Sequence, residues 1–112
     1  MRLNSAKDLD VYKKAYALTG QIRRSSRSVC LNLREAWSKR RYQAHFVSKL
    51  SDCDGENSET DSSLDFARDC GYIRHEQHTE LVGRCQEVGK MLGGMIKDPQ
   101  SFLISDSLIS DF

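Results

Sequence analysis

Apolar residues recur along this chain in steps of three and four, the spacing of one face of an α-helix. The repeat is unbroken between residues 22 and 37, where it forms a band about 100° wide, as a core-facing stripe does. Its positions are Ile22, Ser26, Val29, Leu33 and Ala36 with Trp37. An earlier segment has the same phase at Val11, Ala15 and Leu18. The pattern predicts helix from about Asp8 through this band.

A second helix is predicted from Tyr42 to Cys70, where Gly71 can end it in a left-handed conformation. Its stripe comprises Phe46, Leu50, Cys53, Asn57, Thr60, Leu64 and Ala67. Asn57 and Thr60 are polar residues on this apolar face, and buried polar groups need partners. We therefore expect both to form hydrogen bonds between helices.

A third helix is predicted from Glu76 to Lys97, with Pro99 behind its end. Its stripe comprises Leu81, Cys85, Val88, Leu92 and Met95 with Ile96. Long helices, short loops and this spacing indicate an all-α fold, an antiparallel up-and-down helical bundle. Residues 1–97 form the bundle, and residues 98–112 form a tail that is either mobile or docked on a neighbour.

Length and composition point to one small domain outside the membrane. The chain has 112 residues, no apolar run long enough to span a bilayer, and no apolar leader near its start. We therefore expect a cytoplasmic protein. None of its four cysteines forms a CxxC pair, so they are interpreted as buried, reduced thiols.

The net charge of +1 conceals two halves of opposite sign. Residues 1–50 carry twelve Lys and Arg against three Asp and Glu, a net charge of +9. Residues 51–112 carry five against thirteen, a net charge of −8. The basic half suits a polyanionic partner, although the two halves could also neutralise each other within or between chains.

Seven basic residues concentrate between residues 21 and 41, next to the first stripe. Arg23, Arg27, Arg34 and Arg41 follow steps of 4, 7 and 7, and Arg24, Lys39 and Arg40 add to the field. Such a row suits the phosphates of RNA or DNA, because each guanidinium is a rigid fork of donors. It equally suits carboxylates such as Asp54, Asp61 and Asp65 at a helix or subunit interface. Few aromatic residues are available for stacking, so sequence readout should be weak.

The sequence gives no reason to predict an enzyme, a cofactor or a metal. The acidic run from Asp52 to Asp61 has its glycine at position four, whereas a calcium loop needs it at position six. His75 and His78 lack the further ligands of a zinc site, so we interpret them as surface residues.

The stretch QIRRSSRSVCLNLREAWSKRR resembles the signature of the bacterial four-helix-bundle family of ribosomal-RNA intervening-sequence proteins, which is related to the accessory protein of diversity-generating retroelements. Matching residues are Gln21, Ile22, Arg23, Arg24, Ser25, Ser28, Val29, Asn32, Leu33, Glu35 and Arg40. The resemblance also covers DLDVYKKA and LDFARDCGYI. It implies a four-helix bundle that assembles into a homopentameric ring. In the retroelement relative, it also implies a basic surface that binds nucleic acid and a reverse transcriptase.

The chain departs from this family between Ala15 and Gln21, where members usually carry a loop with a proline. Either the first two helices are fused here, or a stretch of the first helix is absent. We favour the second alternative, because three helices would leave the apolar stripes partly uncovered. The sequence thus predicts a non-enzymatic, oligomeric bundle that binds RNA or DNA non-specifically. The alternative is an interaction module whose basic row contacts another subunit or a partner protein.

Overall fold

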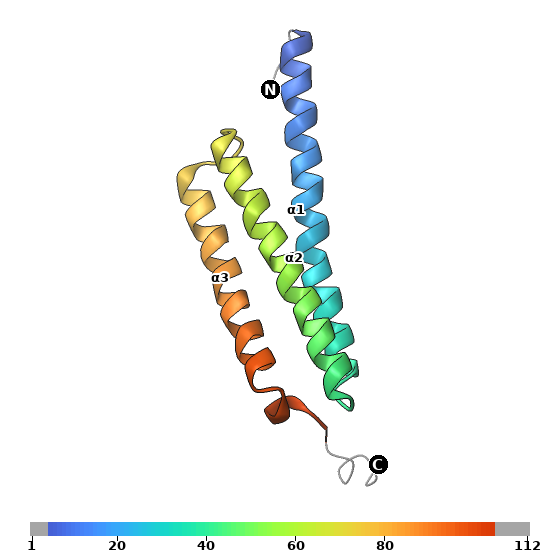
Figure 1. The fold of residues 1–112 in the computed structure, drawn as a ribbon. Coiled ribbons are helices and arrows are strands. Elements are labelled where there is room, and N and C mark those ends of the chain that lie inside the picture. Colours follow the sequence, from blue (N-terminus) through green and yellow to red (C-terminus); the bar gives the residue numbers. More distant parts are fainter. Residues whose placement is uncertain (1–4, 105–112) are drawn as a thin grey trace.

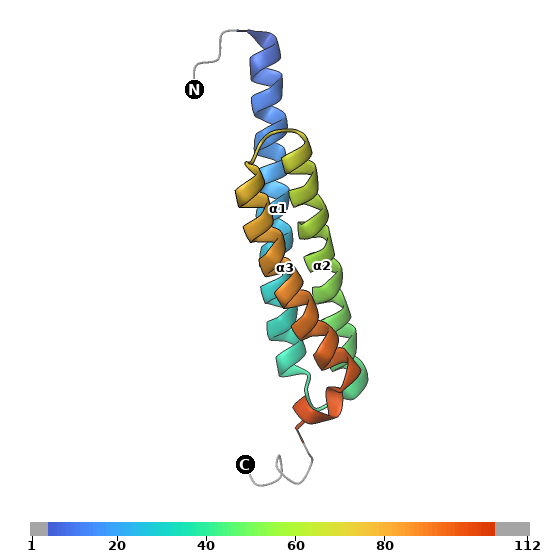
Figure 2. The ribbon, with the colours of Figure 1, turned by 90° about the vertical axis from the view of Figure 1, so that its left-hand side faces the viewer.

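The computed structural model describes residues 5–104, which form three antiparallel helices and a short 3₁₀ turn (Figure 1). The elements are α1 (Ala6–Ser38), α2 (Gln43–Asp69), α3 (His75–Lys97) and η1 (Pro99–Phe102). The described part is a rod of 67 × 21 × 19 Å, and Figure 2 shows its length from the side. The predicted all-α, antiparallel fold is confirmed for these residues.

α1 is a single helix of 33 residues, so the two segments on either side of Gln21 are fused. It begins at Ala6, two residues before the predicted start, because the Ser5 side chain accepts a hydrogen bond from the Asp8 amide at 3.2 Å. Within α1 there is no proline, and its one glycine, Gly20, costs only about 1 kcal/mol relative to alanine. Nothing in the local sequence therefore breaks the helix.

α2 lies between the other two helices and holds the core. α1 and α3 both pack on α2, while their backbones do not contact each other within the described chain (Figure 1). All seven stripe positions predicted for α2 are buried, from Phe46 to Ala67. The main cluster combines Ala36, Phe46, Leu50, Cys53 and Leu92. A central helix buries its whole stripe because it has a neighbour on each side.

The polar positions on α2 form the interhelical hydrogen bonds that the sequence predicts. The Thr60 hydroxyl lies 2.7 Å from the Ser25 hydroxyl of α1, and both side chains are buried. The Asn57 side-chain amide donates to the carbonyl oxygen of Cys85 on α3 at 2.8 Å. α2 is thus connected to each outer helix by a polar contact inside an apolar interface.

The helix ends and the start of the tail follow the local signals. Gly71 has φ of 75°, and the Tyr72 amide donates back to the Ala67 carbonyl at 2.8 Å, which ends α2. The start of the tail docks on its own chain: Phe102 packs on Phe46, with ring centroids 6.5 Å apart. The remainder of the predicted tail, residues 105–112, lies outside the described residues.

Several positions predicted to be buried on the outer helices are exposed instead. Leu33 and Trp37 of α1 and Leu81 of α3 are 37%, 46% and 40% exposed. Ser26 is exposed, and its neighbour Ser25 is buried in its place. These positions are exposed because α2 is the one long helix on which α1 and α3 each pack within residues 5–104, so each buries a narrower band than its apolar stripe offers. The expectation that three helices leave the stripes partly uncovered is confirmed.

His78, interpreted from sequence as a surface residue, is in fact buried. Its side chain is 8% exposed, and its Nε2 lies 2.7 Å from a carboxylate oxygen of Asp65 on α2. The antiparallel packing of α3 on α2 brings these residues together across the turn. His75, three residues earlier, is exposed as expected.

The prediction of four buried thiols is wrong for Cys30 and Cys70, which are exposed. Cys30 lies on a side of α1 that no helix covers, and Cys70 lies just beyond the end of α2. Cys53 is fully buried, and its thiol donates to the Val29 carbonyl oxygen at 3.4 Å. Burial, with a smaller effect from the Asp52 carboxylate, raises the pKa of Cys53 to about 11.

We expect thiol labelling to distinguish the exposed cysteines, Cys30 and Cys70, from the buried Cys53. At pH 8, iodoacetamide should modify Cys30 and Cys70 quickly and Cys53 only after unfolding, because the thiolate is the reactive form. Mass mapping of labelled peptides measures this. Because the fold raises the pKa of Cys53 from its ordinary value of 9.0 to about 11, the neutral thiol favours folding below about pH 9. This contribution to the free energy of unfolding is lost as the pH rises towards 11. If Cys53 of the folded protein were labelled as fast as Cys30, its thiol would not be buried in the core.

Candidate nucleic-acid interface

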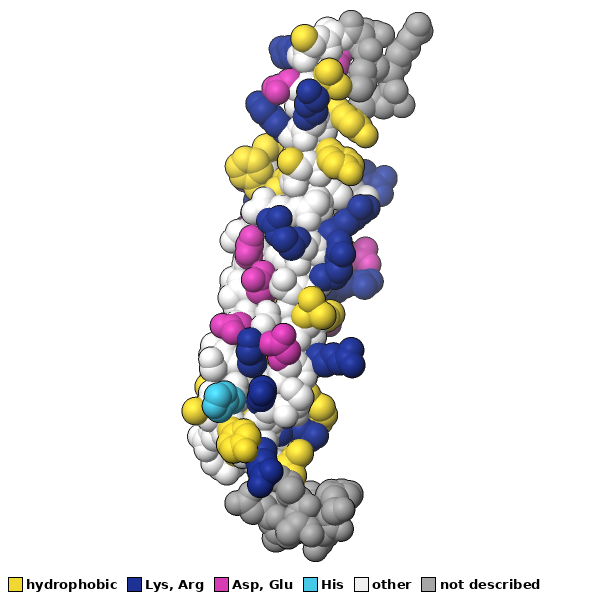
Figure 3. Space-filling view, turned by 90° about the vertical axis from the view of Figure 1, so that its right-hand side faces the viewer, with side chains coloured by type: hydrophobic (Ala, Val, Ile, Leu, Met, Phe, Trp, Pro, Cys, Tyr) yellow, Lys and Arg dark blue, Asp and Glu magenta, His cyan; other side chains and the backbone are white. Residues whose placement is uncertain are grey.

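The seven predicted basic residues all lie at the surface of α1 and the turn that follows it. Arg23, Arg24, Arg27 and Arg34 belong to α1, while Lys39, Arg40 and Arg41 lie in the turn. All are exposed except Arg40, which is half-buried. Figure 3 shows Lys and Arg side chains gathered along this side of the rod. The chain therefore does present a basic surface, and one helix positions most of it.

Three of these arginines share one face of α1. At 100° per residue, Arg23, Arg27 and Arg34 fall within about 40° of one another and span about 17 Å along the axis. Arg24 lies about 100° further round the helix. Arg41 does not continue the row as the spacing suggested, because α1 ends at Ser38. On the helix itself, the predicted row therefore consists of Arg23, Arg27 and Arg34, without Arg41.

Within residues 5–104, the four arginines of α1 form no ion pair with a carboxylate. The one ion pair between α1 and α2 among these residues joins Glu35 to Lys49 at 2.8 Å, and it raises the pKa of Lys49. Of the acids proposed as partners for the arginines, Asp65 bonds to His78, while Asp54 and Asp61 form no ion pair in this part of the chain. Among the described residues, therefore, no ion pair between helices joins the basic half of the chain to the acidic half.

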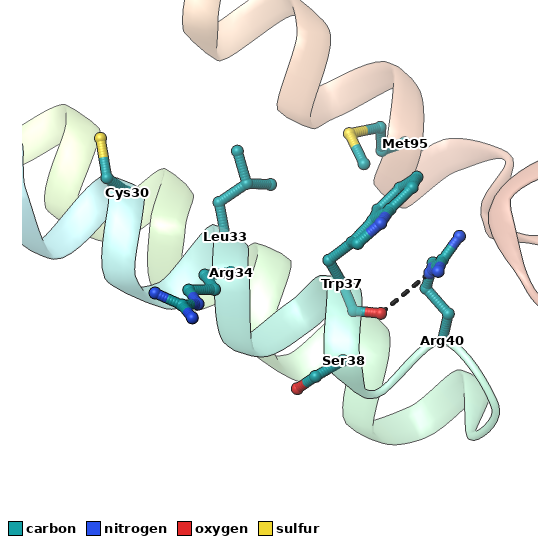
Figure 4. Close-up of a pocket in the computed structure, with 7 residues that line it drawn as sticks. All are labelled: Cys30, Leu33, Arg34, Trp37, Ser38, Arg40 and Met95. Carbon is teal, nitrogen blue, oxygen red and sulfur yellow. Dashed lines mark hydrogen bonds between the residues drawn. The ribbon is translucent and has the colours of Figure 1, made fainter.

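Arg40 and Trp37 form a fixed pair at the end of the row (Figure 4). The guanidinium carbon of Arg40 lies 3.7 Å from the centre of the indole ring, and its Nε donates to the Trp37 carbonyl oxygen at 2.9 Å. Arg41 lies 5.9 Å from the Tyr42 ring. Stacking on an aromatic face orients a guanidinium while leaving its charge in place.

An open groove of about 660 Å³ lies between α1 and α3 beside this pair (Figure 4). Its floor and walls are mostly apolar, and two arginines border it. The lining residues are Cys30, Leu33, Arg34, Trp37, Ser38, Arg40 and Met95. The groove explains why Leu33 and Trp37 remain exposed, because no helix of the described chain covers this side.

Sequence reasoning missed two tyrosines that extend the arginine row. Tyr12 and Tyr16 lie in the N-terminal half of α1, whose first turns project beyond α2 and α3 (Figures 1 and 2). Their rings stack with centroids 6.4 Å apart and an angle of 25° between planes. The signal was present in the sequence, since Tyr16 precedes Arg23 by seven residues and so shares its face.

Among residues 5–104, no group of three or more His, Cys, Asp and Glu side chains is placed to hold a metal ion. No helix in that range has the length and apolar character needed to cross a bilayer.

The fold and surface define a small, elongated, antiparallel α-helical protein with one basic face. The chain belongs to the 23S rRNA-intervening sequence protein family, whose model matches residues 5–94. This match confirms the resemblance inferred from the QIRRSSRSVCLNLREAWSKRR stretch. No curated protein and no solved structure matches the chain.

Proposed function

We propose that this chain is a non-enzymatic, oligomeric protein that binds RNA through phosphate contacts along α1. One observation carries the proposal: Arg23, Arg27 and Arg34 are exposed on a single face and form no ion pair within the described chain. Such guanidinium groups are free to meet phosphates without first breaking an ion pair. A guanidinium fork matches two phosphate oxygens, and release of counterions from the nucleic acid adds to the affinity.

The family name favours RNA over DNA as the ligand. It refers to an intervening sequence of 23S ribosomal RNA, so an RNA-related role fits the family. Contacts to phosphates carry no base information, so the binding is expected to be largely independent of sequence. Each binding assay should therefore compare the affinity for RNA with the affinity for DNA.

The uncovered apolar surface supports self-association. Leu33 and Trp37 line a groove that α3 leaves open, and a helix from a second copy would complete a four-helix arrangement there. Repetition of this contact around an axis would give the ring that the family resemblance implies, with five copies in a homopentamer. The arginine face of α1 would then be repeated around the ring.

A second candidate function is the docking of a partner protein, such as a reverse transcriptase. The groove between α1 and α3 favours it, because an apolar channel bordered by Arg34 and Arg40 fits an amphipathic helix with acidic edges. In that case the basic row would bind carboxylates of the partner or of another subunit rather than phosphates.

The substitution Arg27→Glu separates these functions. Arg27 is exposed and its one hydrogen bond, from Nε to the Arg23 carbonyl oxygen, is long at 3.4 Å, so the helix should tolerate the change. Our proposal predicts an assembly of unchanged mass that binds RNA at least about tenfold more weakly, since the variant replaces an attraction to phosphate with a repulsion. Native mass spectrometry and fluorescence anisotropy measure the two results.

Lys90→Glu is the matched control, because Lys90 is exposed on α3 and undergoes the same reversal of charge. It should leave both the mass and the RNA affinity almost unchanged. Loss of the oligomer in the Arg27→Glu variant would instead assign the arginine row to a subunit interface.

A further inference from the structure

Five residues form one continuous face of α1, which we call the Tyr–Arg face. They are Tyr12, Tyr16, Arg23, Arg27 and Arg34, spaced by 4, 7, 4 and 7 residues. At 100° per residue they fall within about 60°, on the side of the helix turned away from α2. Figure 3 shows hydrophobic side chains, mixed with Lys, Arg and acidic side chains, at the upper end of α1, and further Lys and Arg side chains below them.

Both tyrosines of this face are exposed to solvent. Tyr16 is 70% exposed and Tyr12 is 45% exposed, although each ring already stacks on the other. Neither hydroxyl has a hydrogen-bond partner among the described residues. The pair therefore has ring surface open to a ligand, and it contributes little to the packing of the bundle.

The chemistry of this face fits single-stranded nucleic acid better than a duplex. Arginines can hold phosphates of either form, but aromatic rings can stack only on bases whose faces are accessible. In a duplex those faces are covered by neighbouring base pairs. A row with open aromatic rings at one end and guanidinium groups along the rest can therefore use both parts only with a single strand.

The dimensions of the face suit a short single strand. From Tyr12 to Arg34 the helix rises about 33 Å at 1.5 Å per residue. At 3.4 Å per stacked nucleotide, this length corresponds to about ten nucleotides. The Tyr–Arg face is turned away from α2, and the first turns of α1 project beyond α2 and α3, so a strand can follow this face without meeting another helix (Figures 1 and 2).

We propose that the Tyr–Arg face is a binding site for single-stranded nucleic acid, in which Tyr12 and Tyr16 stack on bases and the arginines bind phosphates. This inference rests on the proposed function and adds the structural class of its ligand. Every base has a stacking face, so the site selects single strands without selecting a sequence.

The test compares one RNA of about 12 nucleotides, long enough to span the face at 3.4 Å per nucleotide, with the duplex of the same sequence. We expect the protein to bind the single strand more tightly. The double variant Tyr12→Ala, Tyr16→Ala should weaken single-strand binding by about tenfold or more and leave duplex binding unchanged, because the alanines cannot stack on bases while the arginines still bind phosphates. Fluorescence anisotropy at low salt measures both affinities.

Two further variants test whether the loss of single-strand affinity comes from the aromatic rings of the Tyr–Arg face. Tyr12→Phe with Tyr16→Phe keeps the rings and should keep single-strand affinity. Phe66→Ala removes a ring that is 61% exposed on α2, outside the Tyr–Arg face, and should change neither affinity.

Three results would overturn the inference while leaving phosphate binding intact. The first is that the unmodified protein binds the single strand and the duplex with equal affinity. The second is that the Tyr12→Ala, Tyr16→Ala variant still prefers the single strand. The third is that this variant forms an assembly of lower native mass, which would make the tyrosines subunit contacts. Failure of the unmodified protein to bind either RNA would instead overturn the proposed function itself.

Discussion

Replacing Arg23, Arg27 and Arg34 together by alanine should weaken RNA binding by about 100-fold or more at low salt. Each guanidinium that meets a phosphate contributes about 1.5–3 kcal/mol, and 1.4 kcal/mol is a factor of ten in affinity. The expected loss is set below the sum of three such contributions because neighbouring cations, Arg24 among them, compensate in part. The salt dependence should also become shallower, by about 0.7–0.9 in the log–log slope for each phosphate that the variant no longer binds.

The matched control removes the same amount of charge from another helix. Arg84, Lys90 and Lys97 are exposed on α3, and their replacement by alanine lowers the net charge by the same three units. If the Tyr–Arg face is the site, this control should lose only a small part of the affinity, through the weaker general field. Equal losses in the two triple variants would mean that net charge, and not this face, determines binding.

The second large effect concerns the core at Phe46. Its side chain is fully buried at the meeting point of all three helices and η1. Phe46→Ala should lower the free energy of unfolding by about 3–5 kcal/mol, because it removes a large apolar side chain and leaves a cavity. That is a large share of the roughly 5–15 kcal/mol that stabilises a typical domain. Urea unfolding followed by circular dichroism measures the change.

Phe66 lies on the same helix and serves as the control. Its side chain is 61% exposed, so Phe66→Ala should change the free energy of unfolding by no more than about 0.5 kcal/mol. Comparable losses in the two variants would show that the side of α2 bearing Phe46 is not the core.

The sequence predicts the central helix best. All seven stripe positions of α2 are buried as expected, including the polar residues Asn57 and Thr60. Periodicity identifies which face of a helix is apolar, and α2 has a neighbour on each side of that face. The same reasoning is less accurate for α1 and α3, because a pattern does not state how many neighbours are present. Leu33, Trp37 and Leu81 remain exposed for that reason.

Predictions for the residues of the site are likewise limited, because one helix's pattern does not show which side chains of the other helices will contact it. The sequence places Arg23, Arg27 and Arg34 beside the apolar band and leaves open whether they face solvent or a helix interface, and within the described chain they are exposed. The burial of His78 could not be predicted, because its contact with Asp65 depends on the register between α2 and α3. That register is fixed by packing along the whole helix pair, which no local motif contains.

The central claim is that phosphates bind to the arginine face of α1, and the salt dependence of RNA affinity tests it most directly. The affinity of the unmodified protein for a short RNA should fall steadily as salt rises, with a log–log slope of about −2 or steeper if three arginines each release a counterion. An affinity that does not change with salt, or no binding at the lowest salt, would contradict the account.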